Sequence, residues 1–219
     1  MKEIRLLMTG KMGSGKSYAA DYLRSEHGAM SWSRTELMKR LAHSVADHIG
    51  DPDEILFRIF PNDEERCAVR DDLFAYHHTV EEGKPRRLYQ DITEICQEHN
   101  PLCFEQELDA RIRATGNCSF SLIDDVRKLS AFEFFVERGY ATLRIDASET
   151  VRRERMMSRD GYLPSEETFA HISETDLDGI DHDFSIRNDS QDLIGFYGDL
   201  DRIVLQLRSE DRTLSQIYS

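Results

Sequence analysis

The pattern of hydrophobic and polar positions predicts short strands that alternate with helices at both ends of the chain. Five short apolar runs have the length and composition of buried parallel strands: 4–9, 29–32, 118–123, 140–145 and 183–186. Segments with helical spacing separate or follow them: 16–26, 33–48, 129–138, 150–158 and 190–207. This alternation predicts an α/β fold in which a five-stranded parallel sheet is covered by helices on both faces.

Residues 51–115 differ in character from the segments on either side. They are rich in charged side chains and show no clear strand pattern. Helical spacing predicts three helices within them: 63–77, 86–98 and 104–114. The block is too long for a single crossover helix, so we predict a helical insertion into a core made of 1–50 and 116–219. By analogy with related folds, such an insertion shapes the site of a second substrate.

A glycine-rich segment lies between the first predicted strand and the first predicted helix. Residues 10–17 read Gly-Lys-Met-Gly-Ser-Gly-Lys-Ser, the complete G-x-x-x-x-G-K-[ST] motif of phosphate-binding loops. Backbone N–H groups and the N-terminus of the following helix bind phosphates in such loops. We therefore assign nucleotide binding to Gly10, Gly13, Ser14, Gly15, Lys16 and Ser17. Lys16 is expected to reach the β- and γ-phosphates of ATP, and the Ser17 hydroxyl is expected to bind Mg²⁺. The alternative is a chance glycine-rich turn.

Two acidic residues, Asp124 and Asp125, directly follow the apolar run 118–123. Open α/β sheets bind ligands at the carboxyl ends of their strands. One carboxylate could therefore bind Mg²⁺ through water, and the other could accept a proton from the attacking group. We assign Asp125 to the metal and to catalysis and Asp124 to the substrate, although the sequence leaves their roles interchangeable. Arg127 could hold the acceptor's phosphate as a bidentate fork. The alternative is an ordinary turn with solvated charges.

Four arginines fall within residues 152–159 of an otherwise acidic chain. On a helix, Arg152, Arg155 and Arg159 lie roughly on one face. That face could close over a transferring phosphoryl group as a kinase lid, over about 152–165. We accordingly place Arg155 among the nucleotide-binding residues and Arg159 among the catalytic ones. The alternative is a solvated face paired with neighbouring glutamates.

Composition narrows the classes of partner. The 219-residue chain carries 28 Lys and Arg against 42 Asp and Glu, a formal net charge of −14. Phosphate neutralisation dominates nucleic-acid binding, so this charge argues against nucleic acid as the main ligand but not against a small phosphorylated one. The chain lacks a long apolar run and enters its first strand at once, so we expect no membrane span and no signal peptide. Its four cysteines form no C-x-x-C pair, which indicates reduced thiols in a cytoplasm.

Four segments together resemble the P-loop kinase superfamily that contains the nucleoside monophosphate kinases. They are the loop 10–17, the strand end Asp125-Val126-Arg127, the helix-Gly-strand segment 132–145, and a tail in which His171-Ile172-Ser173-Glu174 precedes 183–189. Within the superfamily, the pattern is similar to bacteriophage-type deoxynucleoside monophosphate kinases and to phosphomevalonate kinases. The resemblance implies a P-loop NTPase three-layer α/β/α fold and phosphoryl transfer from ATP to an acceptor that already carries a phosphate.

At the matching positions, the resemblance implies a role for several residues. Asn188 would lie near the adenine or the base of the lid, Arg127 would hold the acceptor's phosphate, and Arg159 would be the lid arginine. The phage kinases usually have Asp-Thr after the loop lysine, whereas this chain has Ser17-Tyr18. The helical block also has no clear match.

The acceptor is expected to be a deoxynucleoside monophosphate, bound between the carboxyl edge of the sheet and the helical block. Arg86, Arg87 and Arg111 of that block could add to Arg127 in gathering its doubly charged phosphate. The alternative is that these arginines are solvated partners of the many acidic residues in the block. An amphipathic C-terminal helix would permit a homodimer.

Other activities stay open at this stage. Dephospho-coenzyme A kinase shares the fold and the loop. Phage kinases that phosphorylate hydroxymethylpyrimidines in DNA are also related, although the net charge counts against that group. The non-kinase alternative is a nucleotide-binding sensor ATPase. The chain contains neither the Asn-Lys-x-Asp motif of GTPases nor the Leu-Ser-Gly-Gly signature of ABC ATPases.

Overall fold

The chain divides into two compact units. The computed structural model describes residues 3–46, 52–77, 85–116, 118–163, 176–190 and 192–209. One unit comprises Met1–Trp32 and Asn117–Ser219, and the other comprises Ser33–Gly116. We call them the sheet unit and the helical unit. The helical unit begins earlier than the predicted insertion 51–115, because it also includes the helix that follows β2.

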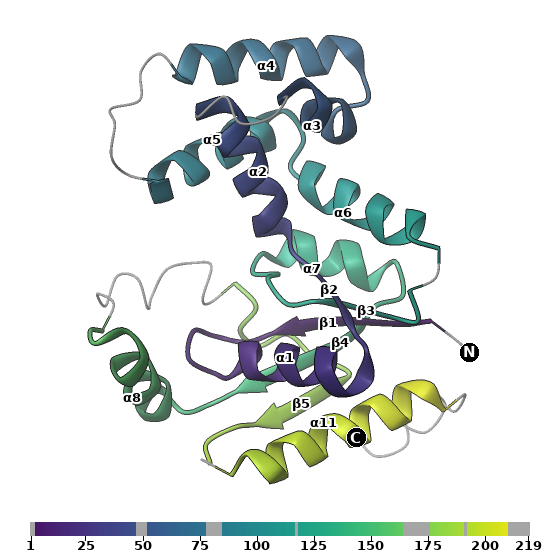
Figure 1. Cartoon of the computed structure of the whole chain (residues 1–219), viewed down its shortest axis with the longest axis vertical. Helices are drawn as coiled ribbons and strands as arrows, with labels where there is room; N and C mark the ends of the chain where they lie inside the picture. The colour runs from purple at the N-terminus through teal and green to yellow at the C-terminus, as the bar shows by residue number, and fades with distance from the viewer. Residues whose placement is uncertain are drawn as a thin grey trace. The chain divides into compact units, whose positions relative to one another are not determined.

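The sheet unit holds all five strands that the structure describes (Figure 1). Its elements are β1 (Ile4–Thr9), α1 (Lys16–His27), β2 (Met30–Trp32), β3 (Phe120–Ile123), α7 (Leu129–Val136), β4 (Ala141–Asp146), α8 (Glu149–Asp160), β5 (Phe184–Arg187) and α11 (Leu193–Arg208). The strands pair in parallel in the order β2-β3-β1-β4-β5. The register places Ile4 beside Phe120 and Leu6 beside Ala141. The predicted α/β fold with a five-stranded parallel sheet is confirmed.

The strand order explains how helices cover both faces. From β1 the chain crosses through α1 to β2 on one side, whereas from β3 it crosses through α7 to β4 on the opposite side. Crossovers between parallel strands are right-handed, so opposite directions of travel place α1 and α7 on opposite faces of the sheet. Both crossovers bring their loops to the carboxyl edge of the central strands, where ligands bind in folds of this kind.

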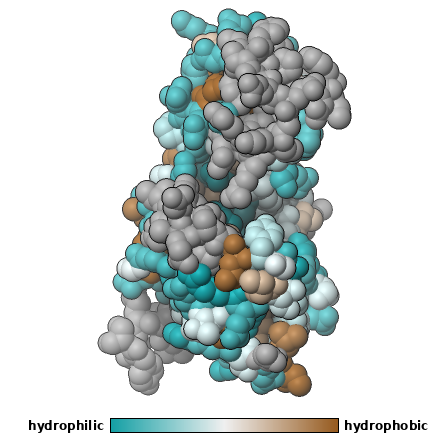
Figure 2. All heavy atoms as spheres, turned by 90° about the vertical axis from the view of Figure 1, so that its left-hand side faces the viewer, coloured by the Kyte–Doolittle hydropathy of each residue, from teal (hydrophilic) through white to brown (hydrophobic). Residues whose placement is uncertain are grey.

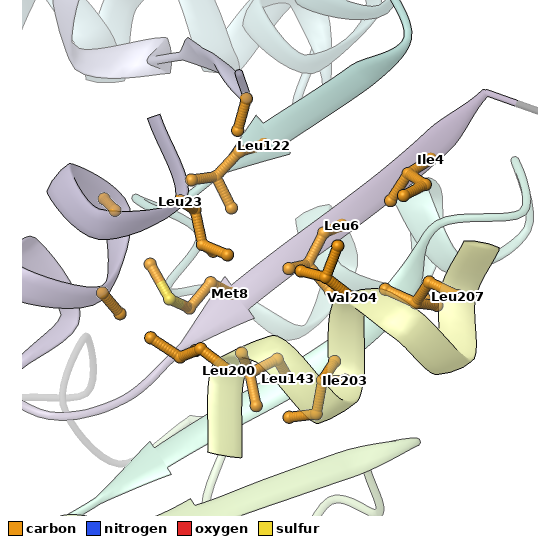
Figure 3. Packing of buried hydrophobic residues seen from close by; sticks show 14 of the residues in the cluster. Ile4, Leu6, Met8, Leu23, Leu122, Leu143, Leu200, Ile203, Val204 and Leu207 are labelled. Atoms are coloured by element: carbon orange, nitrogen blue, oxygen red, sulfur yellow. The ribbon is translucent and has the colours of Figure 1, made fainter. Parts of the chain in front are cut away.

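The core on one face joins the sheet to α1 and α11. Ile4, Leu6 and Met8 alternate along β1 and point to this face, and all three are buried. Figure 3 shows how they meet Leu23 of α1 and the apolar side chains of α11. The period-two pattern of β1 and the helical spacing of residues 200–207 therefore bury one shared surface, which holds the loop between β1 and α1 at a fixed place.

The helical unit has a core of its own. Its described helices are α2 (Arg34–Ala46), α3 (Pro52–Ile59), α4 (Asp63–His77), α5 (Pro85–His99) and α6 (Cys103–Ala114). Leu41, Phe60 and Phe104 are among the fully buried side chains that pack between them. The sequence did not predict α3. Pro52 stands at the first position of this helix, where its missing N–H costs nothing.

The surface of the described residues carries both polar and large apolar side chains. Figure 2 shows one face, on which the coloured apolar side chains are scattered among polar ones. Among the described residues, the helices are all too short or too polar to cross a bilayer. On α11, Ile194 and Leu205 are exposed while the opposite face of the helix is buried. The homodimer that this helix would permit stays a prediction.

Candidate functional site

The glycine-rich loop connects the end of β1 to the start of α1. Gly10 and Gly15 have φ angles of 146° and 105°, which side chains other than glycine rarely adopt. A Cβ at Gly10 would overlap the carbonyl oxygen of Ile145 on β4, and a Cβ at Gly15 would overlap the amide of Asn188. Glycine is required at both positions because the loop passes directly over the ends of neighbouring strands.

Side chains from elsewhere in the chain, among them Asn188 and Arg155, donate hydrogen bonds to the carbonyl groups of the loop. The Asn188 amide, which is buried just after β5, donates a hydrogen bond to the Ser14 carbonyl at 2.8 Å. Arg155 of α8 donates to the Gly13 carbonyl at 3.4 Å and to the Asn188 Oδ1 atom at 3.4 Å. Because these donors take up the loop's carbonyl oxygens, they fix the conformation of the peptide groups whose N–H atoms would bind phosphate.

The arginines of α8 separate into two kinds. Arg152 is buried, and its Nη1 atom donates to the Met12 carbonyl of the loop at 3.3 Å. Arg159, one turn beyond Arg155, is 67% exposed and binds Asp160 with two hydrogen bonds of 2.7 and 2.6 Å. The first two turns of the helix thus contact the loop, and Arg159 pairs with its own neighbour.

The loop and the first turn of α1 fit a chain of phosphates. Lys16 donates its ammonium group to the Gly10 carbonyl, so that the charge lies across the loop. In the described part of the chain, the buried Ser14 hydroxyl has no hydrogen-bond partner. The first four N–H groups of a helix lack helical acceptors, and in α1 the first helical bond runs from the Ala19 N–H to the Gly15 carbonyl at 3.1 Å, so these groups are those of residues 15–18. Ser17, next in this turn, offers the hydroxyl that Mg²⁺ takes beside bound phosphates.

The acidic pair at the end of β3 lies within the electrostatic reach of this loop. Burial raises the pKa of the Asp124 carboxyl, and the charge of Asp125 raises it further, whereas Lys16 and Arg24 oppose that shift. The net effect is an Asp124 pKa above its ordinary value. A carboxylate with a raised pKa is a better proton acceptor near neutral pH. The described residues contain no group of three or more His, Cys, Asp or Glu side chains that could hold a metal. The binding of a metal by Ser17 and Asp125 stays a prediction.

Arg127 lines a small pocket at the carboxyl end of β1. The pocket is bounded by Thr9, Gly10, Lys11, Val126, Arg127, Arg144, Leu177 and Asp178. The predicted acceptor-phosphate residue therefore lies beside the first glycine of the phosphate loop, which sequence reasoning placed in the nucleotide site. These two predicted groups share one pocket in the described sheet unit.

Other predicted residues fall in the helical unit or outside the described residues. Arg111 lies on α6, where its Nε atom donates to Glu107 at 2.6 Å. Arg86 and Arg87 lie in the first turn of α5, and their side chains are outside the described residues. His171 and the end of the proposed lid are outside them as well. The acceptor role of these arginines stays a prediction.

Sequence reasoning missed several residues around the pocket. Lys11 is a variable position of the loop motif, and Arg144 is the single charge within an otherwise apolar strand pattern, which is a usable signal. His182 Nδ1 donates to the Ile180 carbonyl at 2.9 Å, which leaves Nε2 to meet the Thr9 hydroxyl at 2.7 Å. Burial lowers the pKa of His182, so the neutral form is favoured. No sequence pattern pointed to the contact between Thr9 and His182, which lie far apart in the chain.

Comparison with known proteins finds solved structures that are similar at low identity. No protein-family model and no curated protein matches the chain. TT1252 from Thermus thermophilus has 20% identity over 94% of this chain and 97% of its own, with a TM-score of 0.49. A sugar kinase from Janibacter sp. HTCC2649 has 16% identity over 94% of both chains, with a TM-score of 0.48. A dephospho-CoA kinase from Campylobacter jejuni has 18% identity over 92% of this chain and 96% of its own, with a TM-score of 0.43.

Proposed function

We propose that the protein is an ATP-dependent kinase that transfers the γ-phosphoryl group to a small phosphorylated acceptor, a deoxynucleoside monophosphate. The observation that carries the proposal is the loop around Lys16, supported by Asn188 and Arg155, with Asp124 and Arg127 at the same edge of the sheet. A loop with these surroundings suits transfer of a phosphoryl group, which depends on positioning and on neutralising charge.

Each residue has a role in this scheme. The loop N–H groups and Lys16 would bind the β- and γ-phosphates, and Arg127 would align the phosphate of the acceptor for in-line attack. Mg²⁺ held by Ser17 and Asp125 would supply neutralisation of the developing charge on the phosphate oxygens. Arg155 would keep the loop in its binding conformation, and Arg159 would exchange Asp160 for a phosphate oxygen.

A second acceptor class is favoured by one observation. The phosphate of a nucleoside monophosphate needs no base before it attacks, whereas a hydroxyl acceptor does. The raised pKa of Asp124, close to Lys16, suits removal of a proton from a hydroxyl. Dephospho-coenzyme A, which offers a hydroxyl and also carries phosphate, is therefore the second candidate.

An acceptor panel tests the proposal. The protein is incubated with ATP and Mg²⁺, and ADP formation is measured with each deoxynucleoside and ribonucleoside monophosphate, phosphomevalonate and dephospho-coenzyme A. We expect Lys16→Ala to lower the acceptor-dependent rate by about 100-fold or more, because one preorganised charge on the reacting group is lost. Lys39→Ala, an exposed lysine on α2, is the matched control and should keep the full rate. If the rate of ADP formation is the same with and without each acceptor, the protein is instead a sensor ATPase.

A further inference from the structure

Three basic side chains converge on the pocket at the end of β1. Lys11 comes from the phosphate loop, Arg127 from the segment after β3, and Arg144 from β4. The chain as a whole carries a net charge of −14, so a cluster of three basic side chains contrasts with its acidic composition. Positive side chains brought together by separate elements are the usual form of a site for an anion with several negative oxygens.

A single carboxylate is shared between two of these cations. Asp178 accepts a hydrogen bond from Lys11 Nζ at 2.6 Å through Oδ2, and one from Arg144 Nη2 at 3.1 Å through Oδ1. Burial raises the pKa of the Asp178 carboxyl, but the hydrogen bonds from Lys11 and Arg144 outweigh it and leave the pKa below its ordinary value. The carboxylate is therefore ionised, and each of its oxygens faces a cation, as two oxygens of a phosphate would.

Arg144 has contacts besides the one with Asp178 that hold its position. Its Nε atom contacts both carboxylate oxygens of Asp146 at 2.9 Å, and its Nη1 atom donates to the Leu177 carbonyl at 2.8 Å. The Arg144 side chain is 18% exposed, whereas that of Asp178 is 41% exposed and lies in a turn. A carboxylate on an exposed turn can leave at a lower cost than the arginine that it contacts.

We propose that Lys11, Arg127 and Arg144 form a site for the phosphate of a phosphomonoester, which Asp178 fills with its carboxylate until the ligand displaces it. The ligand class follows from charge. Asp178 pairs with both Lys11 and Arg144, so its departure removes one negative charge from beside two cations and favours the entry of an anion with several negative oxygens. The inference rests on the proposed function, since the phosphomonoester would be the acceptor. Asp178 is then a competitor of the substrate.

Binding measurements on four variants test this site. The full chain is first saturated with a non-hydrolysable ATP analogue and Mg²⁺, which occupies the phosphate loop. Inorganic phosphate and then dTMP are titrated by calorimetry. We expect Asp178→Asn to tighten phosphate binding by about 5- to 30-fold, since a negative charge a few ångströms from the ligand is removed. Asp181→Asn removes the same charge from an exposed residue three positions away and should change the affinity little.

Two further variants separate charge from structure. Asp178→Glu retains the charge and should not tighten binding, while Lys11→Gln should weaken it by about tenfold. The proposal is overturned if Asp178→Asn weakens phosphate binding or matches Asp181→Asn. If the ATP analogue itself does not bind, the proposed function fails. Inorganic phosphate titrated into Lys16→Ala, and into that variant combined with Asp178→Asn, then still decides the Asp178 site.

Discussion

Single-residue backbone geometry decides whether the phosphate loop can form. Gly10 combines a φ of 146° with direct packing against the Ile145 carbonyl of β4. Gly28, which ends α1, also has a positive φ of 67°, but a Cβ there would meet nothing within 4 Å. A substitution at Gly28 therefore introduces backbone strain alone, whereas one at Gly10 introduces both backbone strain and steric overlap.

This difference gives a stability prediction. Gly28→Ala should lower the free energy of unfolding by about 1–2 kcal/mol, the cost of a left-handed conformation. Gly10→Ala should lower it by about 3 kcal/mol or more, because the Cβ also displaces backbone of the neighbouring strand. Urea unfolding followed by circular dichroism measures both losses. Equal losses would mean that the loop adjusts without moving β4.

At the scale of single elements, helix α8 contacts the phosphate loop through two arginine side chains. Arg152 and Arg155 donate to loop carbonyl groups, whereas Arg153 on the same helix points elsewhere and pairs with Glu149 at 2.7 Å. The cluster of arginines that suggested a lid thus includes two residues, Arg152 and Arg155, that hold the loop by its carbonyl groups. Because α8 contacts the loop through its first turns, a ligand bound at its last turn could change the conformation of the loop.

A pair of variants on α8 tests this coupling. Arg155→Gln should weaken binding of an ATP analogue by about tenfold, since charge-assisted hydrogen bonds to the loop and to Asn188 are lost. Arg153→Gln removes the same charge from the same helix at a residue that pairs with Glu149, and its affinity should stay near that of the wild type. Calorimetry on both proteins at one salt concentration compares them. The idea fails if the two variants lose the same affinity.

The limits of sequence reasoning are also clearest at this scale. β1 and β3 were predicted because their apolar runs are buried on both faces, and the loop because its motif fixes spacing. The supports of the loop could not be predicted. Arg155 and Asn188 meet it only after the sheet has brought distant strand ends together. Asp178 carried no pattern at all, since its role depends on two partners from separate elements.

At the scale of the whole molecule, two hydrophobic cores are built from separate parts of the chain. The described core residues of the sheet unit include Leu200, and those of the helical unit include Phe104. The proposed chemistry divides in the same way, with nucleotide binding in the sheet unit and acceptor recognition partly in the helical unit. A destabilising substitution in one core is therefore expected to affect the stability and the ligand binding of its own unit more than those of the other unit.

Two core variants test that division. Phe104→Ala should destabilise the helical unit by about 3–5 kcal/mol through a buried cavity. In this variant the backbone amide hydrogens of α2 to α6 should exchange faster with solvent. Binding of the ATP analogue should persist, and turnover of the acceptor should fall. Leu200→Ala should instead speed exchange in the strands and α11 and weaken nucleotide binding, by a core loss of about 2–5 kcal/mol. Hydrogen exchange detected by mass spectrometry reads both units in one experiment. Uniform acceleration across both units would contradict the division.

The strand order also governs how the protein can be made. Among the described strands, β1 pairs with β3 and β4, and the whole helical unit lies between β1 and those partners in the chain. During synthesis, β1 leaves the ribosome as an apolar segment that has nothing to pair with, while the helical unit, with its more local contacts, can fold first. An unpaired apolar strand is a site for aggregation and for chaperones. The yield of folded protein therefore depends on the time between the synthesis of β1 and the synthesis of its partner strands, β3 and β4.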